Sequence, residues 1–196
     1  MKVVITGNIS SGKSTLIKWL QENPKDSCVI DADFVVHQLY KTNELKEALK
    51  KAFGSQVISK ENEVDRKVLG SIVFSDETQL EKLNQVTQEP IRKALEAQIT
   101  SSLTTYSNVF IEATLAVERN WLSFFDYSIC ITCPDNLRLE RLMRRNSLSI
   151  TDAQNRIYSQ IPQDQKSKAC DFTLNNKSSQ EELIEDFKRI LSKLKI

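Results

Sequence analysis

The sequence has 196 residues, of which 40% are hydrophobic and 27% are charged, a composition typical of one folded domain with a sizeable core. Its 27 Lys and Arg residues nearly balance its 26 Asp and Glu residues, so no overall field favours nucleic acid or an anionic membrane as a partner. No apolar run approaches the ~20 residues of a membrane span, and the first residues do not resemble a signal peptide, so we expect a cytoplasmic protein without a membrane partner.

Five short β-rich runs alternate with longer helical stretches. Most of the runs are apolar throughout, as strands covered on both faces are. They span residues 2–6, 28–31, 108–113, 127–132 and 171–174. This alternation predicts an α/β fold with a doubly wound, five-stranded parallel sheet.

The first predicted strand leads into a glycine loop with the sequence ITGNISSGKST at residues 5–15. Two glycines that bracket four residues, followed by Lys and Ser, form a phosphate loop when a strand precedes them and a helix follows. Successive backbone N–H groups then point at phosphate oxygens, Lys13 reaches the β- and γ-phosphates, and Ser14 offers its hydroxyl to Mg²⁺. We therefore expect ATP and Mg²⁺ to be bound by residues Gly7, Asn8, Ile9, Ser10, Ser11, Gly12, Lys13, Ser14 and Thr15.

The second predicted strand ends in the carboxylates Asp31 and Asp33. A phosphate loop alone does not separate a switch GTPase, a motor ATPase and a small-molecule kinase, but the chain is short and has no NKxD guanine-reading motif. In an extended chain the two side chains would point the same way, toward ligands bound at the strand ends. We predict Asp33 as the general base of a kinase, although it could also cap the following helix, and expect Asp31 to orient the loop or a Mg²⁺-bound water. His37 is interpreted as an ordinary helix residue.

A long helical interval separates the second and third predicted strands. It includes an expected helix over residues 76–103, which Pro90 would kink or divide. The chain is expected to be one domain, residues 1–196, with a helical acceptor-binding insertion at about 34–107 and a lid at about 135–165.

The stretch after the fourth predicted strand is rich in arginine. By composition alone it would be a solvated basic face, but its position is that of the lid in nucleoside monophosphate kinase-like proteins. Arg138, Arg141 and Arg145 share one face by helical spacing. We predict that Arg141 and Arg145 stabilise the transferring phosphate, with Arg144 left open.

The remaining candidates are cysteines and asparagines. The four cysteines are expected to be reduced core residues, because the Cys130-x-x-Cys133 pair has no second such pair and the chain has a single histidine to complete a zinc site. Asn175 or Asn176, just beyond the fifth strand, is placed near the adenine.

Taken in order, these pieces resemble the dephospho-CoA kinase family, a group of phosphate-loop kinases of the nucleoside monophosphate kinase-like type. The resemblance implies transfer of the γ-phosphate of ATP to the ribose 3′-hydroxyl of dephospho-CoA. It also implies that Lys13 and Ser14 hold ATP and Mg²⁺, that Asp33 is the base, and that Arg66 lies in the acceptor-binding region. The pieces are ITGNISSGKST (5–15), IDADFVVHQL (30–39), FG (53–54), VDRKVLGSIVF (64–74), EKLNQVTQEPI (81–91), FDYSICITCP (125–134), LRLERLMRRNSLS (137–149), NRIYSQ (155–160) and CDFTLNN (170–176).

The sequence departs from the family pattern at four positions. Ser10 stands where the loop usually has a glycine, a replacement that the loop can tolerate if this position has a negative φ. Glu89 replaces a histidine, Glu112 replaces an aspartate at the acceptor side, and Thr114 replaces a proline. Two alternatives stay open: another phosphate-loop kinase, of the shikimate or gluconate kinase kind, and a nucleotide-binding regulator without turnover. The sequence leaves the oligomeric state open.

Overall fold

The computed structural model describes residues 1–73 and 76–196 of the chain. The chain forms two compact units, which we call the sheet unit (residues 1–31 and 101–196) and the helical unit (residues 32–100). The helical unit overlaps the insertion expected at about 34–107, but it begins at residue 32 and ends at residue 100. Phe74, the last residue of the 64–74 motif, lies outside the described residues.

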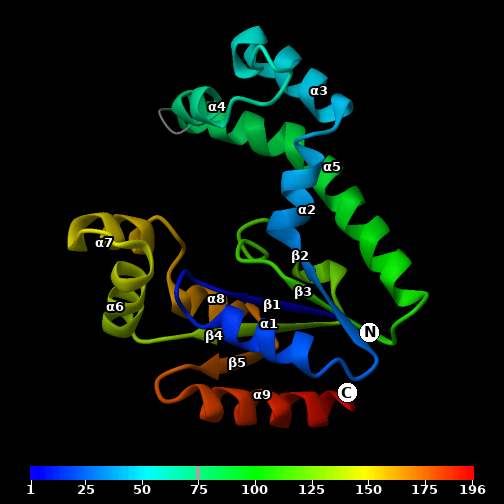
Figure 1. The fold of residues 1–196 in the computed structure, drawn as a ribbon, viewed down its shortest axis with the longest axis vertical. Coiled ribbons are helices and arrows are strands. Elements are labelled where there is room, and N and C mark those ends of the chain that lie inside the picture. The colour runs from blue at the N-terminus through cyan, green and yellow to red at the C-terminus, as the bar shows by residue number, and fades with distance from the viewer. Residues whose placement is uncertain (74–75) are drawn as a thin grey trace. The chain divides into compact units, whose positions relative to one another are not determined.

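The sheet unit contains the predicted five-stranded parallel sheet (Figure 1). Its strands pair in the order β2-β3-β1-β4-β5, and every pairing is parallel. The expected strand bounds are right to within one residue at each end. The strands are β1 (Lys2–Gly7), β2 (Ser27–Asp31), β3 (Asn108–Glu112), β4 (Tyr127–Thr132) and β5 (Phe172–Asn175).

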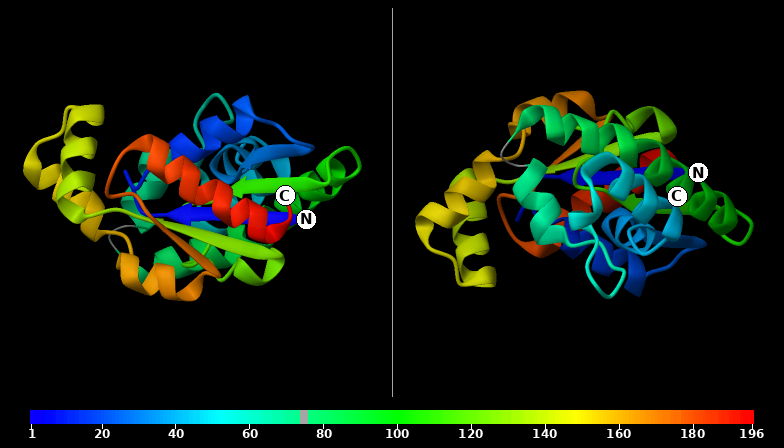
Figure 2. Two further views of the ribbon diagram at one scale, coloured as in Figure 1. Left: turned by 90° about the horizontal axis from the view of Figure 1, so that it is seen from below. Right: turned by 90° about the horizontal axis from the view of Figure 1, so that it is seen from above.

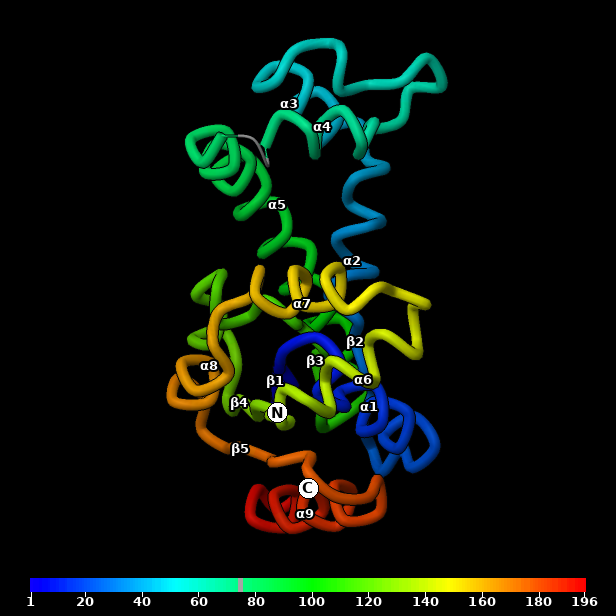
Figure 3. Tube along the Cα trace, turned by 90° about the vertical axis from the view of Figure 1, so that its left-hand side faces the viewer, coloured from blue at the N-terminus to red at the C-terminus, as the bar shows by residue number. Residues whose placement is uncertain are grey.

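Helices cover both faces of this sheet. On one face lie α1 (Lys13–Glu22) and α9 (Gln180–Leu194), and α8 (Gln163–Ala169) lies on the other (Figure 3). Figure 2 shows α9, in red, lying across the strands of the sheet. A serine caps this last helix, because the Ser179 side chain accepts a hydrogen bond from the backbone N–H of Glu182.

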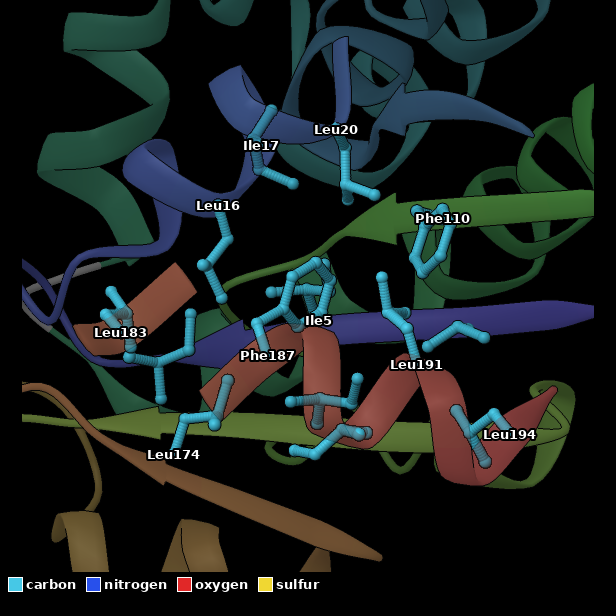
Figure 4. Packing of buried hydrophobic residues seen from close by; sticks show 14 residues of the cluster. Ile5, Leu16, Ile17, Leu20, Phe110, Leu174, Leu183, Phe187, Leu191 and Leu194 are labelled. Atoms are coloured by element: carbon cyan, nitrogen blue, oxygen red, sulfur yellow. The ribbon is translucent and has the colours of Figure 1, made fainter. Parts of the chain in front are cut away.

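The main core fills the space between the sheet, α1 and α9 (Figure 4). The α9 sequence places Leu183, Phe187, Leu191 and Leu194 on one helical stripe, and all four are buried. The Phe187 ring meets the Phe110 ring of β3 in an edge-on arrangement, with centroids 6.3 Å apart. This core holds β1 and α1 rigidly, and therefore holds the loop that connects them.

A second group of helices follows β4. Here α6 (Asp135–Asn146) and α7 (Ile150–Tyr158) pack together around Leu142, Ala153 and Ile157 (Figure 3). α6 begins directly after Pro134. We call α6 and α7 the lid.

The helical unit has its own core, built from α3 (Asn43–Phe53), η1 (Ser55–Val57), α4 (Arg66–Val73) and the first part of α5 (Glu77–Leu103). It begins with α2 (Ala32–Leu39). The structure keeps α5 as one helix through Pro90, so the possible division at that residue is wrong. None of the described helices is long and apolar enough to cross a membrane.

Candidate functional site

Two glycines at the end of β1 and the start of α1 bracket the phosphate loop. Gly7 has φ +144°, and a Cβ there would lie 2.4 Å from the carbonyl oxygen of Ile131 on β4. Gly12 has φ +108°, and a Cβ there would lie 2.1 Å from Nδ2 of Asn176. Close approach of backbone and side chains therefore excludes any side chain at both positions.

Ser10 lies in the middle of this loop with φ +60°, in the left-handed region. The negative φ that would make a serine easy to tolerate at this position is therefore not found. A serine in this conformation is strained, because its Cβ crowds the following carbonyl group. The hydroxyls of Ser10 and Ser11 and the Oδ1 atom of Asn8 are buried without a hydrogen-bond partner among the described residues. The loop thus carries two buried hydroxyls, of Ser10 and Ser11, that could donate hydrogen bonds to a phosphate ligand.

Lys13 opens α1 and turns back over the loop. Its Nζ atom donates hydrogen bonds to the carbonyl oxygens of Gly7, at 2.8 Å, and Asn8, at 3.3 Å. Ser14 is exposed next to it, and in the described structure no side chain caps this helix and no acidic residue lies in its first turn. The N-terminus of α1 therefore presents backbone N–H groups and a positive dipole end to an anion.

The lid arginines share a cavity with this loop. The cavity has a volume of about 480 Å³ and is lined by Ser10, Gly12, Ser14, Thr15, Arg141, Arg144, Arg145, Asn176 and Gln180. Arg141, Arg144 and Arg145 all line the cavity, so the choice among these arginines stays a prediction. Burial raises the pKa of the Cys133 thiol, which accepts a hydrogen bond from Arg141 Nη1 at 3.3 Å and stays neutral beside it.

Arg138 has a different position from the one that helical spacing suggested. It is buried, donates from Nε to the carbonyl oxygen of Ile9 at 3.1 Å, and pairs with Asp135 at 2.7 Å. It supports the loop through Ile9 and is not among the residues that line the cavity.

Asn176, and not Asn175, is the buried asparagine next to the loop. Its Nδ2 atom donates to the carbonyl oxygen of Ser11 at 2.8 Å, and its side chain lines the cavity. Asn175 is the exposed last residue of β5. A contact between Asn176 and adenine stays a prediction.

Two carboxylates lie at the carboxyl ends of neighbouring strands. Asp31 ends β2 and Glu112 ends β3, and the two residues are register partners in the parallel ladder. Glu112 is also the register partner of Ile5, two residues before the loop begins at Gly7. Register partners on adjacent strands project to the same face of a sheet, so these carboxylates share one face at the strand ends.

Asp33 does not lie on the strand. It is the second residue of α2 and an exposed residue of its first turn, so the expectation that Asp31 and Asp33 point the same way along an extended chain is wrong. Asp33 is not an N-cap either, because it already has a helical position.

A second pocket lies within the helical unit, with a volume of about 390 Å³. Arg66 is central to it. Its Nη2 atom lies 2.8 Å from Nδ1 of His37, and its guanidinium carbon lies 5.3 Å from the centre of the Tyr40 ring. Because arginine can only donate, Nδ1 of His37 accepts this hydrogen bond. The pocket is lined by Asp33, Val36, His37, Tyr40, Arg66, Leu69, Gly70, Val73 and Leu83.

His37 and Tyr40 are therefore pocket residues that sequence reasoning missed. His37 had been interpreted as an ordinary helix residue. The signal was the spacing of Asp33, His37 and Tyr40, which are separated by four and three residues and share one helix face. Together with Arg66, these three residues line the pocket of the helical unit.

Glu89 and Thr114, two of the positions that depart from the family pattern, each make contacts with neighbouring side chains. Glu89 lies on α5 and accepts hydrogen bonds from Arg92 at 2.6 and 2.8 Å, which lower the pKa of the Glu89 carboxyl. The carbonyl oxygen of Thr114 accepts from the hydroxyl of Thr6 at 3.2 Å and from the buried amine of Lys166 at 2.8 Å. Lys166 also pairs with Glu118 at 2.8 Å. The segment after β3 is thereby anchored by side-chain contacts.

No group of three or more His, Cys, Asp or Glu side chains in the described residues could hold a metal ion, and the four cysteines are free thiols. A protein cage for a metal is therefore absent from this part of the chain. The exposed Ser14 hydroxyl at the phosphate loop fits the way Mg²⁺ is usually held, by one or two protein oxygens together with substrate phosphates.

Comparison with known proteins gives one consistent result. The family model described as dephospho-CoA kinase matches residues 1–182. A dephospho-CoA kinase from Aquifex aeolicus is 33% identical over 194 residues, covering 98% of this chain and 97% of that protein. Among solved structures, a dephospho-CoA kinase from Campylobacter jejuni aligns with a TM-score of 0.69 at 29% identity, covering 97% of this chain and 98% of that one. A protein from Thermus thermophilus aligns with a TM-score of 0.83 at 29% identity, covering 99% and 97%.

More distant structures share only the fold. A shikimate kinase from Bacteroides thetaiotaomicron aligns over 100% of this chain and 99% of its own with a TM-score of 0.55, at 12% identity. This likeness confirms the phosphate-loop kinase fold, and its low identity carries no information on substrate.

Proposed function

The chain belongs to the dephospho-CoA kinase family, and on that premise we propose how its residues divide the work of the reaction. The protein is a kinase of coenzyme A biosynthesis that transfers the γ-phosphate of ATP to the ribose 3′-hydroxyl of dephospho-CoA. The observation that carries the proposal is the single cavity that brings together the phosphate loop and three lid arginines.

On the donor side, the loop residues 7–15 and the N-terminus of α1 hold the phosphates of ATP. Lys13 exchanges its hydrogen bonds to the Gly7 and Asn8 carbonyl oxygens for contacts with the β- and γ-phosphates. Asn176 keeps the loop in place through Ser11 and borders the space for the nucleoside.

Mg²⁺ suits this donor set, with Ser14 as its protein ligand. Bound to the phosphates, it would neutralise part of their charge. Asp31 and Glu112, side by side at the strand ends, are suited to accept hydrogen bonds from waters in this region.

On the acceptor side, Asp33 and Arg66 line the pocket of the helical unit. We assign Asp33 as the general base that accepts the proton of the attacking 3′-hydroxyl. Arg66 supplies a guanidinium for the pyrophosphate of dephospho-CoA, and Tyr40 and His37 shape the space beside it.

The lid arginines act on the group in transfer. Charge on the equatorial oxygens of the γ-phosphoryl group is best met by fixed cations, and the cavity offers Arg141, Arg144 and Arg145. The lid also keeps water from taking the phosphate in place of the acceptor. ATP and dephospho-CoA are the proposed partners, without nucleic acid or membrane, and the free thiols suit the reducing cytoplasm.

The test is ADP formation by the purified protein with ATP alone and with dephospho-CoA, shikimate or gluconate added. We expect turnover with dephospho-CoA only, and loss of that turnover in Lys13→Ala. The matched control is Lys18→Ala on the same helix, whose side chain is 75% exposed and pairs only loosely with Glu22 at 3.7 Å. Turnover with shikimate or gluconate would favour the alternative kinases. ATP binding without turnover on any acceptor would favour a regulator.

A further inference from the structure

The phosphate loop is held at one residue, Ile9, by groups from the lid and its exit. The backbone N–H of Ile9 donates to Oε1 of Gln160 at 2.7 Å, and its carbonyl oxygen accepts from Nε of Arg138 at 3.1 Å. The Ile9 side chain packs against the buried lid cluster of Leu142, Ala153 and Ile157. Both main-chain polar groups and the side chain of this one loop residue are thus engaged by residues 138–160.

The contact between the loop and the lid exit is reciprocal. Gln160 reaches with its side chain to the main chain of Ile9, and Asn8 donates from Nδ2 to the carbonyl oxygen of Ile161 at 2.8 Å. Two adjacent loop residues and two adjacent exit residues therefore exchange side-chain to main-chain hydrogen bonds. Such a pair of bonds defines both the distance and the register of the two segments.

The exit segment, residues 159–162, joins the lid helix α7 to α8, and α8 is firmly attached to the rest of the sheet unit. Gln163 bonds both main-chain groups of Cys133, where the chain enters the lid, with its Oε1 and Nε2 atoms each at 2.9 Å. Lys166 is fully buried and bonded to Thr114 and Glu118. The base of the lid is therefore anchored, and Gln160 lies between the anchored helix α8 and the lid helix α7.

We propose that Gln160 is a positioning residue that keeps the lid arginines in register with the phosphate loop. Its amide oxygen ties the exit of α7 to Ile9, which immediately precedes the strained Ser10 of the cavity wall. With this bond in place, closure of the lid delivers Arg141, Arg144 and Arg145 to the same phosphates that the loop holds. The inference rests on the role proposed above for those arginines.

A residue with this role should affect the chemical step more than the binding of ATP. Gln160→Met keeps the length of the side chain and removes the acceptor oxygen. We expect kcat to fall about five- to ten-fold, the size set by one intramolecular hydrogen bond, with a smaller change in the KM for ATP. The control is Gln165→Met on α8, an exposed glutamine at which the same exchange should leave both constants within two-fold.

A double-mutant cycle with Arg145→Ala separates this role from a merely structural one. If Gln160 acts through the arginines, Gln160→Met should cost less than about two-fold in kcat once Arg145 is already alanine. If Gln160 only supports the fold, the decreases in kcat of the two single variants multiply in the double variant. Gln160→Ala is the second variant, so that a folding failure of the methionine variant does not end the test. Folding is checked by the fluorescence melting curve of Trp19 and Trp121.

The outcomes divide cleanly. The proposal is supported if Gln160→Met and Arg145→Ala each lower kcat and the double variant loses less than the product of the two single losses. A normal kcat in folded Gln160→Met and Gln160→Ala, or fully multiplicative losses, overturns it. If Arg145→Ala itself leaves kcat unchanged, the role proposed for the lid arginines is wrong, and the role of Gln160 falls with it.

Discussion

Replacing the strained serine of the phosphate loop by glycine should stabilise the protein. Ser10 has φ +60°, whereas its neighbour Ser11 is not among the residues with positive φ. Both hydroxyls are buried without a hydrogen-bond partner in the described structure. The two serines therefore form a matched pair that differs in backbone conformation.

The size of the effect follows from two opposing terms. A non-glycine residue in the left-handed region costs about 1–2 kcal/mol, and this cost disappears in Ser10→Gly. Glycine in turn loses about 0.5–1 kcal/mol more backbone entropy on folding. The free energy of unfolding should therefore rise by about 0.5–1 kcal/mol in Ser10→Gly. In Ser11→Gly only the entropy term applies, so the free energy of unfolding should fall by about 0.5–1 kcal/mol.

Tryptophan fluorescence is the right assay because both tryptophans of the chain, Trp19 and Trp121, lie in the sheet unit with the loop. At about 2–4 °C per kcal/mol for a chain of this size, the two variants should differ in Tm by about 2–8 °C, with Ser10→Gly the higher. An unchanged slope in urea unfolding would confirm that the stability has changed while the surface exposed on unfolding has not.

A particular result would refute the reasoning. If Ser10→Gly melts at or below the temperature of the unaltered protein, the serine is not strained in this loop. If Ser11→Gly raises the free energy of unfolding as much as Ser10→Gly does, the stabilisation comes from removing a buried hydroxyl and not from relieving backbone strain.

Three further predictions concern the site and its supports. Arg145→Ala should lower kcat about ten-fold or more with a smaller change in the KM for ATP, and an effect on KM alone in steady-state kinetics would show a uniform binding role. Asp33→Asn should lower kcat about 10²-fold under saturating substrates, because asparagine cannot take the proton, and Asp31→Asn should cost less; the reverse order would mean that the base is misassigned. Lys166→Met should lower the free energy of unfolding by about 3 kcal/mol in urea titrations, because it leaves the Glu118 carboxylate without its ion-pair partner. An equal loss of stability in the control Lys168→Met, at an exposed lysine, would contradict this explanation.

Local patterns in the sequence were sufficient for the strands, the phosphate loop and the bounds of the long helix α5. Apolar runs of four to six residues between helical stretches are typical of buried parallel strands, and each was placed to within one residue. The glycine spacing of the loop is equally local, because the close approaches at Gly7 and Gly12 exclude a side chain whatever the rest of the fold does.

The errors at the site share one cause. Asp33 was treated as a strand residue, but the chain turns into α2 directly after Asp31, and a bend of this kind depends on where the helix packs. Helical spacing grouped Arg138 with Arg141 and Arg145, but Arg138 is drawn under the loop by Ile9 and Asp135. Spacing defines the face of a helix, whereas only packing decides what that face meets.

The sequence by itself determined the parallel sheet, the phosphate loop and the family, because these depend on residue types at short, regular spacings. Only the tertiary structure decided the conformation of Ser10, the pairing of His37 with Arg66, and the bond from Gln160 to Ile9. The last of these joins residues 151 positions apart, and no local pattern reports a hydrogen bond whose two partners are brought together only when separate elements pack.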